Sequence, residues 1–313
     1  MHRALRQQLL AIFLIILVTI IWGFSFVVSK VALNNIPTFQ FIFFRFIVAA
    51  AAMAVICGKK QLKTLSKKDI KPAIHTGLAL GFAFAFQSIG TKLTTASNTA
   101  FITASYVIII PLITGLLTKK IQRMQLLIAI LAFVGLTAFS LDRNLQFQPG
   151  DSFVFLGALG FAVHFLILGR YTKEYDTRVI TFLQLSVASI VSLLISLATE
   201  PLPQRLDMTS IFCILYSGLL ATGLAFFIQS YAQRILSATQ TAVLMTGESL
   251  FGGLFGWLCF QETFIARQLL GGALLIACMV AIVLLPARMQ NKKSKEPLLT
   301  SPGQEGKTIE TET

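Results

Sequence analysis

Charged side chains are scarce in this sequence. Only 12% of its 313 residues are Asp, Glu, Lys or Arg, whereas 55% are hydrophobic and the mean hydropathy is +0.77. Soluble domains carry about 25% charged residues, so a water-soluble fold of this length would lack the polar surface that it needs. The scarcity therefore argues against an ordinary soluble protein and indicates that most of the chain lies in a lipid bilayer.

Motifs for soluble-enzyme chemistry are also missing. No CxxC or Cys/His spacing joins the four cysteines, which lie in or beside apolar stretches: Cys57, Cys213, Cys259 and Cys278. Such cysteines are typical of apolar packing positions rather than of a disulfide or metal site. The sequence has no Walker A, HExxH or GxSxG motif and no arginine ladder. We therefore expect no enzyme activity, no cofactor, no bound metal and no direct use of ATP.

The basic residues do not gather on one water-soluble face. The net charge is +13, which in a soluble protein would favour a nucleic-acid partner. Here the Lys and Arg residues fall between apolar blocks, where they act as topology signals. We therefore expect no nucleic-acid partner.

Ten apolar blocks are each long enough to span a bilayer, for which about 20 residues suffice. They cover residues 9–29, 39–57, 72–91, 97–118, 122–141, 152–171, 179–199, 208–232, 238–259 and 265–286. The first is too long for the apolar core of a signal peptide and lacks a small-residue cleavage site after it. We predict an all-α integral membrane protein with ten transmembrane helices, located in the cell (inner or plasma) membrane.

The distribution of Lys and Arg predicts the orientation. With the N-terminus in the cytoplasm, the cytoplasmic segments hold 20 of these residues and the opposite segments hold 5. Basic residues concentrate on the cytoplasmic side of membrane proteins, so both termini are predicted to be cytoplasmic. Residues 1–8 then form a short cytoplasmic N-terminus, and residues 287–313 form a polar, disordered cytoplasmic tail.

An internal repeat divides the predicted helices into two groups of five. Gly81–Ala100 aligns with Gly223–Ala242 at an offset of 142 without a gap, and eight of the twenty positions are identical, including Gln87 with Gln229. The repeat units are residues 9–143 and 150–286. Because five is odd, the second unit enters the membrane from the opposite side. Inverted repeats of this kind are typical of secondary transporters that alternate access to a central site.

Several segments resemble one known family. The stretch IIWGFSFVVSKVAL at 20–33 is similar to its first helix, and PTFQFIFFRF at 37–46 is similar to its pattern of an arginine after an extracellular proline turn. Residues 225–276 resemble its most recognisable region, where Glu248 and Glu262 match family glutamates. The family is the drug/metabolite transporter superfamily, specifically its EamA-type permeases. The resemblance covers residues 10–286 and implies export of amino acids or related metabolites and drugs.

One position departs from that family pattern. The first half usually ends its fourth helix with Gly-Glu, but this chain has Lys119 and Lys120, and Lys120 aligns with Glu262. A role for paired glutamates at that end is therefore in doubt, whereas the lysines agree with a cytoplasmic connection.

Two ionisable residues stand out deep inside predicted helices, where charge is costly and usually functional. Arg45 lies about seven residues into the second helix, roughly 10 Å deep. It either anchors helices at an outer gate or meets a substrate carboxylate or phosphate. Glu248 lies near the middle of the ninth helix, where it either makes a packing hydrogen bond as a neutral acid or binds an amine or a coupling proton. The repeat places Gln184 opposite Arg45 and Tyr106 opposite Glu248.

Six further polar or aromatic residues are weaker candidates. They are Gln87, Gln184, Gln229, His164, Trp22 and Tyr106. The glutamines either hydrogen-bond to substrate or join helices. His164 either faces a cavity or packs as a neutral residue. Trp22 and Tyr106 fit an aromatic pocket wall.

These observations together favour a secondary transporter that exports small metabolites such as amino acids by alternating access. Its partners are then a small-molecule substrate, the lipid bilayer, protons as a candidate coupling ion and a second copy of the chain in a candidate homodimer. Three alternatives stay open: a passive channel, a non-transporting membrane scaffold, or a nucleotide-sugar or organophosphate exchanger. Arg45 alone among the basic residues lies deep within a predicted helix, and the lack of a second membrane-embedded one weighs lightly against the exchanger.

Overall fold

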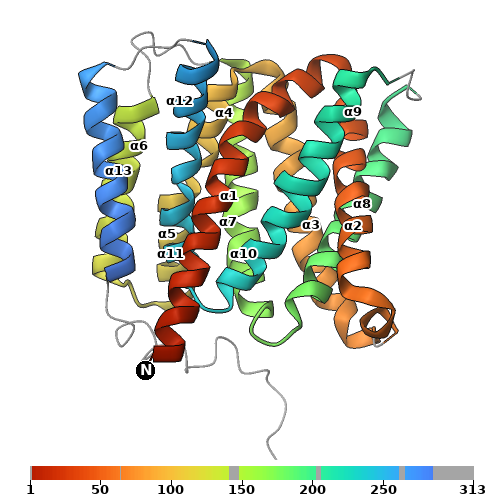
Figure 1. Cartoon of the computed structure of the whole chain (residues 1–313), viewed down its shortest axis with the longest axis horizontal. Coiled ribbons are helices and arrows are strands. Elements are labelled where there is room, and N and C mark those ends of the chain that lie inside the picture. The colour runs from red at the N-terminus through yellow and green to blue at the C-terminus, as the bar shows by residue number, and fades with distance from the viewer. Residues whose placement is uncertain (1, 64, 141–147, 202–205, 261–264, 285–313) are drawn as a thin grey trace, which may run out of the picture.

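The regular structure of the chain is helical (Figure 1). The computed structural model describes residues 2–63, 65–140, 148–201, 206–260 and 265–284. Within these ranges every regular element is a helix, which confirms the all-α prediction. The predicted polar tail at 287–313 and Glu262 lie outside the described residues.

The first half contains six helices. They are α1 (His2–Asn35), α2 (Thr38–Leu62), α3 (Lys67–Leu93), α4 (Ala96–Thr103), α5 (Tyr106–Thr118) and α6 (Arg123–Ser140). Gly58 takes a left-handed φ of 71° inside α2, so the straight part of this helix ends where the predicted apolar block ends. Capping also follows the sequence, because α3 begins with a capping box formed by Ser66 and Asp69.

The second half repeats this order with one added irregularity. Its helices are α7 (Pro149–Tyr171), α8 (Thr177–Thr199), α9 (Met208–Leu215), α10 (Ala225–Gln233), α11 (Ala238–Met245), α12 (Gly247–Phe260) and α13 (Ala266–Leu284). A π-helical stretch, η1 (Tyr216–Leu224), joins α9 to α10. Such stretches are rare and are frequent at functional sites.

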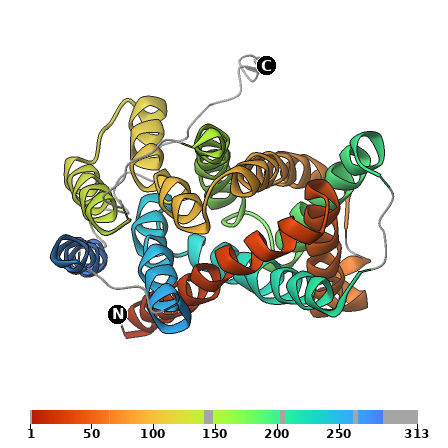
Figure 2. The same ribbon diagram turned by 90° about the horizontal axis from the view of Figure 1, so that it is seen from above.

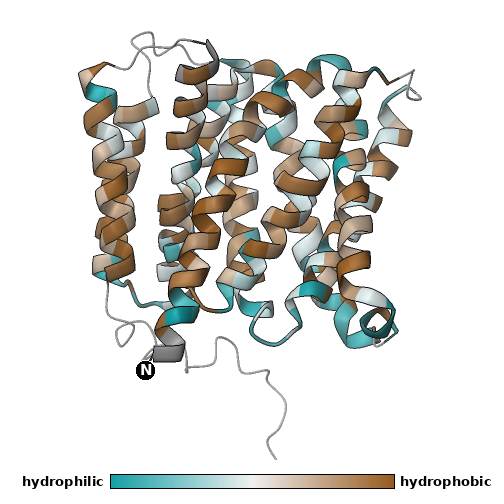
Figure 3. Cartoon of the chain, viewed as in Figure 1, coloured by the Kyte–Doolittle hydropathy of each residue, from teal (hydrophilic) through white to brown (hydrophobic). Residues whose placement is uncertain are grey.

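The lengths and hydropathy of these helices fit a bilayer. Nine helical stretches within the described ranges are long and apolar enough to cross a membrane. Figure 3 shows hydrophobic residues through the middle of the helices and hydrophilic residues at both ends. The ninth predicted block, 238–259, is not among these nine stretches, because it is occupied by α11 and α12, of 8 and 14 residues. Ten crossings therefore stay a prediction, whereas the multi-pass membrane character is confirmed.

Two helices are interrupted at equivalent places. The α4–α5 pair is interrupted at Ala104 and Ser105, and the α11–α12 pair is interrupted at Thr246. Ala104 and Thr246 are separated by 142 residues, the offset of the sequence repeat. Each interruption brings one candidate residue to the first turn of the helix that follows it, Tyr106 in α5 and Glu248 in α12. Interrupted helices are typical of substrate sites in transporters.

Helix packing follows the internal symmetry. The most extensive contacts join α3 to α7, α2 to α8, α6 to α13, α3 to α8 and α1 to α12. The α2–α8 and α6–α13 pairs each unite a helix with its own repeat counterpart, as helices beside a two-fold axis must. Figure 2 shows these two pairs at opposite ends of the molecule, with α1 running between them.

Glycine contacts establish which residues are counterparts. A Cβ added to Gly77 on α3 would lie 2.9 Å from the carbonyl oxygen of Gln184, and one added to Gly218 on η1 would lie 3.1 Å from that of Arg45. Both glycines therefore allow a neighbouring backbone to approach closely, one in each half. The shared geometry makes Arg45 and Gln184 structural counterparts, in agreement with the sequence offset of 139.

Candidate functional site

A cavity lies among α1–α5, α7 and α12. Its empty space is about 540 Å³, which includes open solvent at its mouth. Five of the eight candidate residues line it: Trp22, Arg45, Gln87, Tyr106 and Glu248. Aromatic and small polar side chains complete its wall: Phe26, Phe84, Phe161, Phe165, Ser25, Ser29, Ser88, Thr91 and Thr103. Ser29 and Thr91 lie near the C-terminal ends of α1 and α3, so the cavity extends toward that end of the helices.

Arg45 is buried in this wall with an exposed fraction of 4%. Its Nε donates a hydrogen bond of 3.0 Å to Thr222 Oγ1 on η1, and its guanidinium carbon lies 4.4 Å from the centre of the Phe84 ring. No carboxylate forms an ion pair with it within the described residues. The two terminal nitrogens of its guanidinium have no hydrogen-bond partner among the described residues, so they are available for an anionic group in the cavity.

Glu248 and Tyr106 join the two halves of the chain. Glu248, with an exposed fraction of 1%, accepts a hydrogen bond of 2.9 Å from the Tyr106 hydroxyl through Oε1. The two residues occupy equivalent repeat positions, which the sequence alignment had placed opposite each other. A Cβ on Gly23 of α1 would lie 2.9 Å from the Glu248 carbonyl oxygen, so α1 packs directly against this part of α12. The repeat positions therefore meet at the centre of the site.

Trp22 and Gln87 occupy fixed places at the cavity. Trp22 Nε1 donates to the Ala221 carbonyl oxygen at 2.8 Å, and Gln87 Nε2 donates to Thr103 Oγ1 at 2.9 Å. Both side chains are held by bonds to other helices, and both line the cavity. The pocket interpretation of Trp22 agrees with this placement, and Gln87 combines helix joining with lining.

Three candidate residues lie away from the cavity wall. Gln184, His164 and Gln229 each have an exposed fraction of 0%, and none lines the cavity. His164 Nε2 and Gln184 Oε1 are 2.9 Å apart, within hydrogen-bonding distance. Gln229 Nε2 donates weakly to Gln233 Oε1 at 3.4 Å. This placement agrees with the packing and helix-joining alternatives, and contact with substrate stays a prediction.

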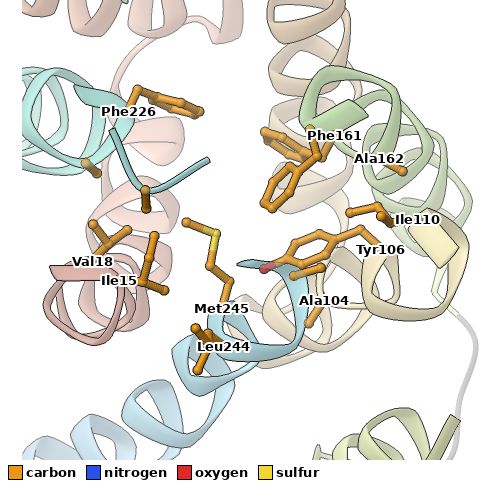
Figure 4. Packing of buried hydrophobic residues seen from close by; sticks show 14 of the residues in the cluster. Ile15, Val18, Ala104, Tyr106, Ile110, Phe161, Ala162, Phe226, Leu244 and Met245 are labelled. Carbon is orange, nitrogen blue, oxygen red and sulfur yellow. The ribbon is translucent and has the colours of Figure 1, made fainter. Parts of the chain in front are cut away.

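Apolar packing closes the cavity toward the N-terminal end of α1. Ile15 and Val18 of α1, Phe226 of α10 and Met245 of α11 belong to one buried cluster with Tyr106. Figure 4 shows the Tyr106 ring extending toward Met245, with Ile15, Val18 and Phe226 on the far side. This apolar cluster therefore lies between the cavity and the N-terminal end of α1.

Sequence reasoning did not identify Thr222 or Phe84 as parts of the site. Thr222 fixes the Arg45 guanidinium from a π-helical turn, and Phe84 provides the ring beneath it. Neither residue differs in type from many other Thr and Phe residues in the helices. The identity of Phe84 with Phe226 at the offset of 142 was the available signal for the aromatic residue.

A metal ion has no set of ligands in the described part of the chain. No three His, Cys, Asp or Glu side chains there lie close enough together to hold one. The cavity wall itself offers groups of opposite charge, Arg45 and Glu248, and aromatic rings for stacking.

Comparison with known proteins gives one family. The EamA-like transporter family model matches residues 9–141 and 148–284. An uncharacterized transporter of Archaeoglobus fulgidus is 28% identical over 86% of this chain and 84% of its own length. An S-adenosylmethionine uptake transporter of Rickettsia prowazekii is 24% identical over 88% of this chain and 92% of its own length.

A solved structure shares the fold. It superposes with a TM-score of 0.73 at 14% sequence identity, covering 88% of this chain and 99% of the other. At that identity the likeness concerns the fold alone. The family model, which matches both halves of the chain, confirms the resemblance drawn from the sequence: the chain belongs to the EamA-like transporter family and is a multi-pass membrane transporter.

Proposed function

We propose that this protein is a secondary transporter of small zwitterionic metabolites that carry an amino-acid head group. The observation that carries the proposal is the pair of opposite charges in one cavity, Arg45 on α2 and Glu248 on α12. Neither forms an ion pair with another residue in the described ranges. Buried ionisable groups in membrane helices are costly, so their presence in a cavity points to function.

Each charge suits one part of such a substrate. The free terminal nitrogens of Arg45 match a carboxylate, which arginine binds through two parallel hydrogen bonds. Glu248 suits an ammonium group. Trp22, Phe84 and Phe161 add aromatic faces, which attract ammonium and sulfonium cations.

The names of relatives sharpen the substrate class. Four Rickettsia relatives are named S-adenosylmethionine uptake transporters, at 23–24% identity. That compound has an amino-acid head, a sulfonium centre and an adenine ring. The cavity offers a partner for each: Arg45 for the carboxylate, Glu248 with the aromatic rings for the cations, and Phe161 and Phe165 for stacking. S-adenosylmethionine is therefore the first compound to test, followed by amino acids.

In this proposal, the direction of transport depends on the concentration gradients across the membrane. The sequence favoured export, whereas the names of the Rickettsia relatives favour uptake. A secondary carrier moves its substrate either way, according to the gradients of substrate and coupling ion. Protons are the proposed coupling ion, with Glu248 as the group that binds them. A homodimer stays a prediction for measurement in solution.

Alternating access is the proposed mechanism. We place ten transmembrane helices in two units, 9–143 and 150–286, with both termini in the cytoplasm. The start of α1 and the end of α13 lie at the same end of the helices, as this arrangement requires (Figure 1). The cavity would then open to the outside, where α1 and α3 end. The symmetric contacts about Tyr106 and Glu248 support a switch to a state open at the other end.

Uptake by purified protein in proteoliposomes tests the proposal. Radiolabelled S-adenosylmethionine and a panel of amino acids are offered with and without a pH gradient. We expect saturable uptake of at least one of these zwitterions, and competition by compounds that keep both charges. Uptake restricted to nucleotide sugars or phosphate esters would replace the proposed substrate class. Flux that does not saturate would indicate a channel, and no flux of any compound would favour a scaffold.

A further inference from the structure

Three polar residues of the open cavity have counterparts elsewhere in the fold. An offset of 139 aligns α1 and α2 with α7 and α8 without a gap, and pairs the identical residues Phe26 with Phe165 and Thr38 with Thr177. Ser25 then corresponds to His164 and Arg45 to Gln184, and the offset of 142 pairs Gln87 with Gln229. The first member of each pair lines the cavity, and the second does not.

The three counterparts are sealed and incompletely hydrogen-bonded. His164, Gln184 and Gln229 each have an exposed fraction of 0%. Each carries a buried polar atom that has no hydrogen-bond partner among the described residues, namely His164 Nδ1, Gln184 Nε2 and Gln229 Oε1. Buried polar atoms without partners are rare and destabilising, so three of them in one set need an explanation.

The surroundings of the two sets are also matched. The Arg45 guanidinium lies 4.4 Å from the centre of the Phe84 ring, and the His164 ring lies edge-on to Phe226 at 5.7 Å. Phe84 and Phe226 are repeat counterparts, and their ring centres are 5.9 Å apart. Each polar set therefore contacts one phenylalanine ring, and the two rings pack against each other between the two halves of the chain.

We propose that His164, Gln184 and Gln229 form a second half of the substrate site, which opens toward the end of α7 when the carrier switches state. This inference rests on the proposed function, because it needs a carrier with two states. Water or substrate would then satisfy the three unpartnered atoms in that state. The ligand is the same zwitterion, met here by neutral hydrogen-bonding groups.

The charge difference between the two halves has a measurable consequence. Arg45 offers a cation to the substrate carboxylate, whereas its counterpart Gln184 is neutral. Hydrogen bonds to a charged group are roughly twice as strong as neutral ones. Substrate should therefore bind more tightly from the side where α1 and α3 end. We expect half-saturation there at a concentration about tenfold lower than on the opposite side.

Side-specific transport measures this asymmetry. Proteoliposomes with the protein in one known orientation, and then in the other, are assayed with the best substrate of the panel. Arg45→Gln should bring the two half-saturation constants within about threefold, by weakening binding on one side only. Equal constants in the wild-type protein would overturn the asymmetry. An absence of transport from either side would instead refute the proposed function.

Cysteine labelling tests the opening of the sealed half. In a background without the native cysteines, Gln229→Cys should react with a membrane-impermeant maleimide from the side where α7 ends. The matched variant Gln87→Cys should react from the other side, and substrate should slow both reactions. Transport by each variant shows that it folds. If Gln87→Cys reacts and Gln229→Cys reacts from neither side during turnover, the second half-site does not exist.

Discussion

The hydrogen bond between Tyr106 and Glu248 offers a quantitative test of how the two halves meet. Tyr106→Phe removes only the hydroxyl that donates to Glu248 Oε1 at 2.9 Å. The ring keeps its stacking against Phe165, with centres 5.1 Å apart. Glu248 then has no hydrogen-bond partner for its carboxyl group among the described residues. The decrease in the free energy of unfolding should therefore reflect this one hydrogen bond.

The expected size comes from hydrogen bonds in membrane proteins. These contribute about 0.6 kcal/mol on average and up to about 1.7 kcal/mol. Because Glu248 is only 1% exposed, we expect Tyr106→Phe to lower the free energy of unfolding by an amount in the upper part of this range, about 1–1.7 kcal/mol. In a Glu248→Met background, which lacks the acceptor, the same change should cost nearly nothing.

Equilibrium unfolding in mixed micelles measures all four proteins of this cycle. Tyr216→Phe is a matched control, because the Tyr216 hydroxyl donates to the backbone oxygen of Ile21 at 2.8 Å and should cost the same in both backgrounds. Independent sites add within about 0.3–0.5 kcal/mol. If Tyr106→Phe is equally destabilising with and without Glu248, the two residues are not coupled and the reasoning fails.

Three further predictions concern the cavity and its walls. Arg45→Gln should raise the half-saturation concentration of substrate, measured from the side where α1 and α3 end, about tenfold, from about 1.4 kcal/mol of lost charged hydrogen bonding. Lys92→Gln should leave it unchanged because Lys92 is exposed outside the cavity. In Glu248→Gln, uptake should no longer respond to an imposed pH gradient, since an amide does not titrate; a preserved response would remove Glu248 as the coupling group. Gly218→Ala should lower the free energy of unfolding by about 1–3 kcal/mol, because the added Cβ would lie 3.1 Å from the Arg45 carbonyl oxygen. Gly169→Ala is the control, because its Cβ would lie 3.6 Å from the nearest side chain and should be tolerated. Thermal melting of both variants measures the difference.

Much of the fold follows from hydropathy and the repeat. Apolar block length predicts helices because backbone polar groups in a bilayer must bond within the segment. The offset of 142 paired Tyr106 with Glu248, and the structure places these residues in direct contact. The cost of buried charge identified Arg45 and Glu248, and both line the cavity.

Which of the two halves lines the cavity could not be predicted. Gln87 and Gln229 are identical residues at equivalent repeat positions, but only Gln87 lines the cavity. The two halves are similar in sequence, so the sequence does not indicate which of them lines a cavity. That depends on how the two halves pack against each other. The π-helical turn that brings Thr222 to Arg45 could not be predicted either, because its amino-acid composition does not differ from that of an ordinary apolar helix.

Counterflow tests the central claim most directly. Proteoliposomes are loaded with unlabelled substrate and diluted into a trace of the labelled compound. A carrier that alternates access about Tyr106 and Glu248 should accumulate label transiently above its equilibrium level, because loaded carriers return faster than empty ones. Label that enters at the same rate in loaded and empty vesicles, without an overshoot, would contradict alternating access.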